Sequence, residues 1–327
     1  MPASLFVPQM DTSAPMTLCN PFALPGQWLK ANLHTHTTVS DGDTAPAERV
    51  QQYRDAGYDV LAISDHHRVV PIDDLARPGL VLLQSVEVHP PCPGGPLYHL
   101  VCLNVPEGFT CDKDETAQSV VQRARAAGGE VVLAHPYWCG RTVDQILAID
   151  DLIAIEVYNN TCGRIGKADS SVVWDYVLAT GRMLPATGVD DVHAGGDLFG
   201  SWTMIRAREA TSEAVMDALR QGAFYASCGP EITDFGYTNG AYFLHCSPVV
   251  EICFIGRGSQ GRCLRAAGEG DLLQEALWTA DPGLPYVRAM VTDVDGKRAW
   301  TPPLGQPILA RTIHASPVRT TQPGPAS

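Results

Sequence analysis

Apolar residues gather in short, continuous runs along the chain, and each run is followed by polar residues. Such runs are typical of strands buried on both faces of a sheet, and five of them stand at residues 60–64, 80–83, 97–103, 131–134 and 152–157. We expect helices between the strands, the clearest at residues 46–56, 114–127 and 170–180. Pro46 begins the first of these and Gly57 follows it, as is usual at helix ends. The alternation of strand and helix predicts an α/β fold.

Polar residues follow the carboxyl ends of the predicted strands, which is how a barrel of parallel strands displays a catalytic site. An open, doubly wound sheet has the same local pattern. The two folds differ in where their strand ends point, because a closed ring directs side chains from many strands to one place. Candidate ligands follow at least five strands, so we expect a closed β/α barrel.

The chain divides into four predicted segments. Residues 1–25 contain five prolines without periodicity and predict an irregular arm, whereas residues 26–229 predict the barrel. After Cys228-Gly229-Pro230 the pattern alternates, so residues 230–312 predict a small antiparallel β module, with residues 272–276 as its one candidate helix. Residues 313–327 are polar and contain three prolines, which predicts a flexible tail.

Composition limits the partners. The 327 residues carry a formal net charge of −13, which disfavours nucleic acid as a partner and is still compatible with a small anionic substrate. No apolar run is long enough to span a membrane, and the first ten residues show no secretory signal. The ten cysteines include no C-x-x-C pair, so we interpret them as buried thiols of a cytoplasmic protein. The sequence does not indicate an oligomeric state.

The first predicted strand ends in a pair of histidines. His34 and His36 lie two residues apart, so their side chains point to the same face of the strand. Asp41 follows in a Ser-Asp-Gly turn. An isolated H-x-H pair is more often two polar residues at a strand end than a metal site, so the positions of the other histidines decide the interpretation.

Eight of the ten histidines lie between His34 and His193, and most of them follow predicted strands. With the strand-end carboxylates Asp41, Glu87 and Asp191 they form a set of nitrogen and oxygen donors without cysteine, which suits zinc, manganese or iron. About nine candidate donors are too many for one ion, so we expect two or three divalent metal ions that share a bridging carboxylate. Glu87 is the expected bridge, because it is the lone carboxylate at the end of its strand.

The successive motifs resemble those of the PHP (polymerase and histidinol phosphatase) family. They are His34-x-His36, Ser40-Asp41-Gly42, Ser64-Asp65-His66, Val86-Glu87-Val88, Ala134-His135-Pro136 and Asp191-x-His193. The resemblance covers residues 30–226 and implies a distorted seven-stranded β/α barrel whose two- or three-metal centre hydrolyses phosphoesters. The metal ligands that it implies are His34, His36, Asp41, His66, Glu87, His135, Asp191 and His193.

Two details refine this resemblance. His99 is similar to the histidine that follows the glutamate motif in members acting on small molecules. The segment from Gly188 to His193 has one residue more than the usual Gly-Ser-Asp-x-His, and the spacing to His193 assigns the ligand to Asp191 rather than Asp190.

The C-terminal part resembles one branch of that family more narrowly. The segments Phe224-Tyr225-Ala226-Ser227-Cys228-Gly229-Pro230-Glu231-Ile232 and Val291-Thr292-Asp293-x5-Ala299-Trp300 are similar to the CehA/McbA branch. Members of this branch have an added β domain, and its namesakes are similar to carbamate hydrolases. The resemblance therefore leaves two chemistries open, phosphoester hydrolysis and carbamate hydrolysis.

The mechanism that we expect uses a hydroxide bridging two ions, which attacks phosphorus in line. Asp65 precedes His66 and is a candidate acceptor that orients an imidazole, and His67 is a candidate acid for the leaving group, with a structural role as its alternative. Three residues after the strand at 152–157 are candidate substrate contacts: Tyr158, Asn159 and Arg164. For Arg164 the alternative is a solvated loop charge, and we expect His89, in a proline-rich loop, to lie outside the site.

Three functions remain in competition. The first is a metal-dependent phosphoesterase acting on a small phosphorylated molecule. The second is a metallohydrolase of a carboxylic ester or carbamate with the same ligands, which differs in whether the pocket offers cations to a phosphate. The third is a non-catalytic module that binds a partner through its β domain. It requires a decayed metal site, yet every motif position retains a donor.

Overall fold

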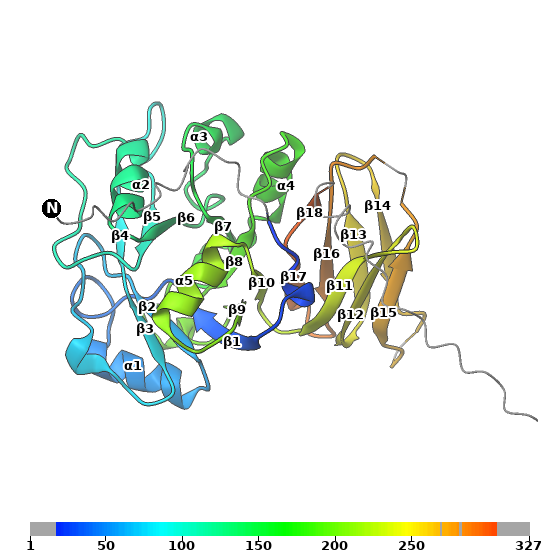
Figure 1. Cartoon of the computed structure of the whole chain (residues 1–327), viewed down its shortest axis with the longest axis horizontal. Coiled ribbons are helices and arrows are strands. Elements are labelled where there is room, and N and C mark those ends of the chain that lie inside the picture. Colours follow the sequence, from blue (N-terminus) through cyan, green and yellow to red (C-terminus); the bar gives the residue numbers. More distant parts are fainter. Residues whose placement is uncertain (1–17, 269, 281–282, 306–327) are drawn as a thin grey trace, which may run out of the picture.

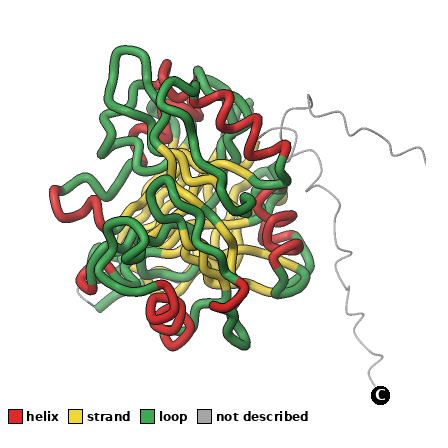
Figure 2. Tube along the Cα trace, turned by 90° about the vertical axis from the view of Figure 1, so that its left-hand side faces the viewer, coloured by secondary structure: helices red, strands yellow, loops and turns green. Residues whose placement is uncertain are grey.

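The structure is a computed structural model that describes residues 18–268, 270–280 and 283–305. At one end of the molecule two sheets are surrounded by helices, and at the other end lies a region of strands alone (Figure 1). Figure 2 shows the strands in the middle of the helical end, with the helices around them. The predicted tail at 313–327 and most of the predicted arm at 1–25 lie outside the described residues.

The first sheet begins with the strand that precedes the histidine pair. It contains three neighbouring parallel strands, β1 (Gln27–Asn32), β2 (Val60–Ile63) and β3 (Val81–Gln84). On its other side β1 pairs in antiparallel fashion with β9 (Trp202–Ala207), which pairs in the same way with β10 (Phe224–Ser227). All four residues of β2 are buried, as the apolar run predicts.

The second sheet supplies the remaining histidine motifs. Its strands follow chain order: β4 (Val86–Val88), β5 (Leu100–Leu103), β6 (Glu130–Leu133), β7 (Ala154–Asn159) and β8 (Ala186–Val189). β6, β7 and β8 are parallel, but β5 is antiparallel to both β4 and β6. The expectation that all of these strands are parallel is therefore wrong for β5, because the long connections on either side of it allow the chain to reverse.

The two sheets meet without closing into one ring. Single bridges join Thr35 to Val192 and His66 to Glu87, both of them parallel. Only Ser85 separates β3 from β4, so the chain passes directly from one sheet to the other. The architecture is a mixed α/β fold with several sheets, and the closed (β/α)7 barrel is not confirmed. Both bridges contain motif residues, so the motifs lie where the sheets meet.

The helices begin and end close to the predicted positions. They are α1 (Pro46–Asp55), α2 (Ala117–Ala126), α3 (Val143–Leu147), α4 (Ser171–Ala179) and α5 (Ser212–Arg220). Threonine side chains cap three of them: Thr116 accepts from the Ser119 amide, Thr142 from Gln145 and Thr211 from Ala214. Short 3-10 turns complete this part at Pro21–Ala23, Asp73–Leu75, Thr161–Ile165 and Gly195–Asp197.

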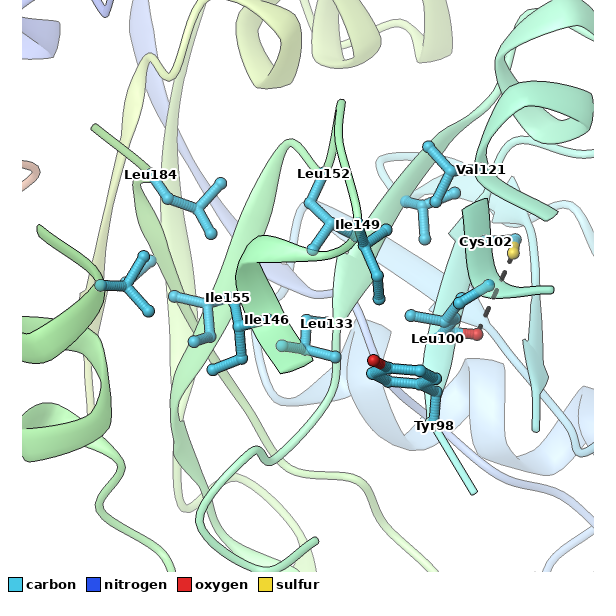
Figure 3. Close-up of a cluster of buried hydrophobic side chains, with 14 of the residues drawn as sticks. Tyr98, Leu100, Cys102, Val121, Leu133, Ile146, Ile149, Leu152, Ile155 and Leu184 are labelled. Carbon is cyan, nitrogen blue, oxygen red and sulfur yellow. Dashed lines mark hydrogen bonds between the residues drawn. The ribbon is translucent and has the colours of Figure 1, made fainter. Parts of the chain in front are cut away.

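The apolar runs form the core between the second sheet and its helices. Figure 3 shows this cluster, with Leu133 and Ile155 from the sheet close to Ile146 of α3. These side chains are fully buried, so each contributes about 1.5–3 kcal/mol of burial free energy. This packing fixes β6 and β7, whose carboxyl ends carry candidate site residues.

The C-terminal region is made of strands, as predicted. They are β11 (Ile232–Thr238), β12 (Ala241–Val249), β13 (Glu251–Ile255), β14 (Gly261–Arg265), β15 (Leu273–Trp278), β16 (Tyr286–Thr292), β17 (Arg298–Trp300) and β18 (Leu304–Gly305). The candidate helix at 272–276 is wrong: residues 273–276 lie in β15, where Ala276 pairs with Leu244 of β12 and is buried. Pairing with a neighbouring strand has overridden the local helical preference.

The β module is continuous with the first sheet. β10 pairs with β17, which pairs with β16, so one ten-stranded sheet runs from β3 to the edge strand β14. The predicted boundary at residue 229 falls directly after β10, although no break in the sheet marks it. In the part of the chain that the structure describes, no helix has the length and apolar character needed to cross a bilayer.

Candidate metal centre

Two pairs of motif residues from distant parts of the chain meet at the junction of the sheets. The backbone amide of Asp191 donates to the His34 carbonyl at 3.0 Å, and that of His36 donates to the Val192 carbonyl at 3.2 Å. The Asp191 oxygen Oδ1 consequently lies 2.9 Å from His36 Nε2 and 3.2 Å from His34 Nε2. The two imidazole nitrogens are 3.0 Å apart. The two pairs therefore form one cluster, as the motifs predict.

Glu87 lies at the centre of this cluster. Its oxygen Oε2 faces three imidazole nitrogens, at 2.9 Å from His66 Nδ1, 3.3 Å from His34 Nε2 and 3.4 Å from His36 Nε2. Its oxygen Oε1 faces three others, at 2.7 Å from His99 Nδ1, 3.5 Å from His135 Nε2 and 3.7 Å from His89 Nε2. The two carboxylate oxygens of Glu87 thus face two separate groups of imidazole nitrogens.

Asp41 forms the exposed side of the cluster. Its Oδ2 lies 3.4 Å from Nε2 of both His66 and His193, and its side chain is 52% exposed. The turn that carries Asp41 requires glycine at position 42, because a Cβ on Gly42 would lie 2.7 Å from the backbone of His36. The open side of the centre is therefore bordered by Asp41, His66 and His193.

Asp65 holds this same turn rather than an imidazole. It accepts hydrogen bonds from the Thr37 amide and hydroxyl at 2.8 and 2.7 Å, and from the Ser40 amide and hydroxyl at 3.0 and 2.7 Å. The prediction that Asp65 orients a histidine is not supported, because its two oxygens are occupied by these donors. Asp65 instead fixes the backbone between His36 and Asp41.

Glu156 is a part of the centre that the sequence analysis missed. Its Oε1 is 2.7 Å from His34 Nδ1, and its Oε2 accepts from the His135 amide at 2.8 Å and from Asn159 Nδ2 at 2.9 Å. A carboxylate on Nδ1 leaves Nε2 of His34 free to bind a metal. The available signal was a buried carboxylate between Ile155 and Val157, inside an apolar strand.

Asn159 also holds carboxylates in place. Its amide nitrogen donates to Glu156 at 2.9 Å and to Asp191 Oδ2 at 3.1 Å, and the residue is 1% exposed. This position disagrees with the expected contact to substrate, since the amide is buried beneath the ligand carboxylates. Asn159 links the carboxylate that orients His34 to the carboxylate that faces the imidazole pair.

His89 belongs to the cluster, so its predicted place outside the site is wrong. Its ring centroid is 3.9 Å from that of His99, and its Nε2 is 3.7 Å from Glu87 Oε1. The proline-rich stretch that follows suggested an irregular loop. However, Glu87 and His89 are two residues apart, so an extended backbone turns both to the same face.

His67 lies at the edge of the cluster, with its Nε2 3.2 Å from His89 Nδ1. Burial and the neighbouring imidazoles of His89 and His66 lower the pKa of His67 below its ordinary value. The imidazole is therefore mainly neutral at pH 7 and would have to gain a proton before it could donate one. The predicted role as the acid stays a prediction.

Arg164 and Tyr158 have other partners. Arg164 Nη2 lies 2.6 Å from Asp197 Oδ2, which also accepts from the His193 amide at 3.0 Å, so this ion pair supports the loop of His193. The Tyr158 ring packs against Trp300 at 5.6 Å and lines a pocket of about 490 Å³ together with Lys297. Contact of either residue with substrate stays a prediction.

The carboxylates of Glu87, Asp191 and Glu156 are buried, so nearby cations would stabilise their negative charge. Burial would raise the pKa of Glu87, but the imidazoles around it, above all His34, hold it well below its ordinary value, and the same balance lowers the pKa of Asp191. Burial would lower the pKa of His34, but carboxylates, Asp191 most strongly, raise it well above 6.5. Among the described residues, no lysine or arginine pairs with Glu87, Asp191 or Glu156.

Several buried nitrogen and oxygen atoms of the cluster lie beside other cluster residues without forming a hydrogen bond of good geometry. They include Glu87 Oε2, Asp191 Oδ1, His66 Nδ1 and His89 Nε2. Buried polar atoms rarely lack partners unless a ligand or ion completes them. Groups of three or four of these residues have donor atoms within 4.8 Å of one another, among them His36, Asp41, His66 and His193. The donor set therefore fits divalent metal ions.

Three site residues have a strained backbone conformation, and this conformation sets the direction of their side chains. His67, His135 and Asp191 have φ angles of 53°, 25° and 53°. Such left-handed conformations cost about 1–3 kcal/mol each and are concentrated at functional sites. At Asp191 the cause is visible, because the preceding Asp190 turns away and accepts from Tyr53 Oη at 2.6 Å. The structure thus places Asp191, and not Asp190, beside the histidines.

The comparisons with known proteins agree with this geometry at the level of the fold. A two-domain protein from Bacteroides vulgatus, described as containing a predicted PHP-like metal-dependent phosphoesterase, matches with a TM-score of 0.52 and 15% identity. The match covers 90% of this chain and all of that one. The chain has the fold of this PHP-like protein. The resemblance in the motifs is thereby confirmed for the fold, but the CehA/McbA branch is not confirmed.

Two other solved structures match less well. An amidohydrolase from Chromobacterium violaceum and a putative metal-dependent phosphoesterase from Bifidobacterium adolescentis are both 18% identical, with TM-scores of 0.42 and 0.41. Each match covers 51% of this chain and 88% of the other. No protein-family model and no curated protein matches the chain. The fold assignment therefore depends on the Bacteroides protein.

Proposed function

We propose that the protein is a metal-dependent hydrolase that cleaves phosphoesters of a small molecule. The observation that carries this proposal is the position of Glu87, whose two oxygens each face three imidazole nitrogens. A carboxylate placed between two sets of donors is suited to bridge two ions. We assign the ligands to His34, His36, Asp41, His66, Glu87, His99, His135, Asp191 and His193, with His89 as an addition.

The donor chemistry supports two or three divalent ions of the zinc, manganese or iron type. Imidazole and carboxylate groups suit these metals, and hydrogen bonds from neighbouring residues hold two of the proposed ligands in place. Glu156 fixes the orientation of His34, and Asn159 fixes that of Asp191. Bound ions would supply an activated water and would neutralise charge that develops on the substrate.

The protein's own residues define where a substrate can enter. His34, His36 and Glu87 are buried, whereas Asp41 is 52% exposed and His66 and His193 are about one-fifth exposed in their side chains. A substrate therefore approaches from the Asp41 side. Trp138 borders the other histidine group, with its ring 5.1 Å from that of His135 and 5.6 Å from that of His99.

Hydrolysis of a carboxylic ester or carbamate is the second candidate, and one observation favours it. Arg164 is the one cation among the candidate substrate contacts, but it pairs with Asp197 at 2.6 Å and supports the His193 loop. A phosphate group needs cations from the protein more than a neutral ester does. The non-catalytic alternative ranks below both, because the donors converge as a working centre requires.

Metal analysis combined with a substrate screen tests the proposal. The protein is loaded with zinc, manganese or iron and assayed against phosphomonoesters, phosphodiesters, aryl esters and carbamates. We expect two or three ions per chain and phosphoester turnover. Turnover of aryl esters or carbamates without phosphoesters would overturn the phosphoesterase assignment in favour of the second candidate.

A matched pair of variants tests the metal centre itself. Glu87→Ala removes the group that both sets of imidazoles share, so we expect metal and activity to be lost together. His245→Ala is the control, because this histidine is half exposed on β12, far along the chain from the motifs, and lies 3.8 Å from Glu275. Full metal content in Glu87→Ala would show that Glu87 does not bridge the ions.

A further inference from the structure

Two cysteines face each other in the hairpin formed by β13 and β14. Cys253 and Cys263 are directly paired across the antiparallel ladder, and both are free thiols with sulfur atoms 2.6 Å apart. Side chains directly opposite each other in an antiparallel pair project from the same face of the sheet. The fold therefore holds the two thiols together before any reaction occurs.

The pair is open to solvent and to small reagents. Cys263 is exposed and Cys253 is partly exposed, which disagrees with our expectation that the cysteines are buried thiols. β14 is the edge strand of the ten-stranded sheet, so no described strand of that sheet lies beyond Cys263. The next pair on the same face, Glu251 and Arg265, forms an ion pair at 2.6 Å that pins the two strands in register.

The other cysteines do not offer this arrangement. Six of the eight are buried, and Cys19 and Cys111 are partly exposed. Cys19 donates to the Gln221 carbonyl at 3.0 Å, and the Cys111 sulfur lies 4.0 Å from His67 Nδ1. Within the described residues, the sulfur-to-sulfur contact of Cys253 and Cys263 is the only one of its kind.

We propose that Cys253 and Cys263 are a site of reversible disulfide formation, with a small-molecule disulfide such as oxidised glutathione as the oxidant. One thiol loses its proton and attacks the external disulfide, which releases one glutathione thiol and leaves a mixed disulfide. The second thiol then loses its proton and attacks the protein sulfur, which releases the second glutathione thiol. Two electrons pass from the cysteine pair to the oxidant, so the reaction balances.

The surroundings set the rate and the consequence of this reaction. Burial raises the pKa of both thiols, and Glu251 raises it further, so the reaction is slow at neutral pH and accelerates as the pH rises. The bond closes the loop from residue 253 to 263 and ties the edge strand to its neighbour. We expect it to raise the unfolding temperature of the protein. Figure 1 shows β14 far from β4 and β6, so the bond leaves the metal centre intact.

Mass spectrometry of the full chain tests the proposal. After incubation with oxidised glutathione and blocking of free thiols, we expect the loss of two hydrogen atoms and one peptide cross-link, between Cys253 and Cys263. The unfolding temperature should rise, and a dithiol reductant should reverse both changes. A stable glutathione adduct at Cys263, no change, or a cross-link between other cysteines would each overturn it.

Serine variants separate the pair from the rest of the chain. Cys253→Ser leaves Cys263 without its partner, so the glutathione adduct should persist there and the rise in unfolding temperature should disappear. Cys246→Ser is the matched control, because Cys246 is a buried cysteine of β12, the strand that precedes β13 along the chain. This control should still form the cross-link at the rate of the unchanged protein. Loss of the cross-link in the control would contradict the assignment.

Discussion

Glu156 accepts the hydrogen bond from His34 Nδ1 at 2.7 Å, although 122 residues separate the two along the chain. The other oxygen of the same carboxylate accepts a hydrogen bond from the His135 amide at 2.8 Å. One buried side chain therefore sets the orientation of a histidine in the first sheet and the backbone of a histidine in the second. It therefore acts on two proposed ligands, His34 and His135.

Glu156→Gln should weaken metal binding without unfolding the protein. A glutamine can still accept from His34, but its NH2 group would then face the His135 amide, and two donors cannot bond. Losing a group that orients a ligand usually costs about 10–100-fold in metal affinity. Competition with a chelator measures the change. Glu130→Gln is the control, because Glu130 is a buried carboxylate that pairs with Arg220 at 2.9 Å; equal affinities in the two variants would contradict the role of Glu156.

His89→Ala should lower both metal affinity and activity. The centroid of its ring lies 3.9 Å from that of His99 with the two rings tilted, and its Nε2, near Glu87, is a buried atom without a hydrogen bond. We expect a loss of about 10-fold or more in affinity, whether His89 binds an ion or only supports His99. Metal titration of the variant beside His245→Ala measures this. A metal affinity equal to that of the control would mean that His89 does not contribute to metal binding, as expected from the sequence.

The sequence predicted only those site residues that local patterns, such as the spacing along a strand, can identify. A period of two placed His34 and His36 on one face, and the spacing to His193 selected Asp191 over Asp190. The same period relates Glu87 to His89, but the prolines that follow suggested a loop. Glu156 could not be found in this way, because a single carboxylate in an apolar strand has no local partner and its role exists only across the two sheets.

The fold, too, could be predicted only where local patterns in the sequence determine it. Apolar runs and helix ends predicted the strands and helices closely, because these depend on burial and capping within a few residues. The direction of β5 and the open arrangement of the sheets depend on how long connections return, which no local pattern records. The segment in β15 was misjudged for the same reason, since its pairing with β12 decides its structure.

Glu115 makes stability depend on pH through its contacts with Arg123. Its oxygens accept from Arg123 at 3.1 and 2.8 Å and from Ser119 at 2.8 Å. Burial would raise the pKa of Glu115, but these donors hold it below the ordinary value of 4.5. A carboxyl whose folded pKa is depressed stabilises the protein above its unfolded pKa, and that contribution disappears as the pH falls through the folded value.

Glu115→Gln should therefore unfold at a lower temperature than the unchanged protein at pH 7. The gap between the two should narrow as the pH falls below about 4.5 and should close once Glu115 is protonated. Thermal unfolding across this range measures the gap, and metal loss in acid affects both proteins alike. Glu209→Gln removes an exposed carboxylate and should show no gap. A gap for Glu115→Gln that stays constant with pH would contradict the expectation.

Trp138 is an exposed aromatic side chain beside two of the proposed ligands. It is 42% exposed, and its ring lies 5.1 Å from that of His135 and 5.6 Å from that of His99. Tyr137 beside it is 44% exposed. A substrate held at these histidines would bring its organic part against the indole, so a flat apolar group would gain contact there.

Trp138→Ala should therefore raise the KM for an aryl phosphate more than the KM for a small alkyl phosphate. Contact between aromatic groups is worth about 0.5–1.5 kcal/mol, which corresponds to roughly 2–13-fold. Trp138→Phe should retain most of the preference, and Tyr176→Ala, which removes an exposed aromatic ring from α4, should not change it. Steady-state kinetics on both substrates measures the ratio. Equal changes in KM for the two substrates would mean that Trp138 does not contact the organic part, whereas loss of metal would mean that it supports His135.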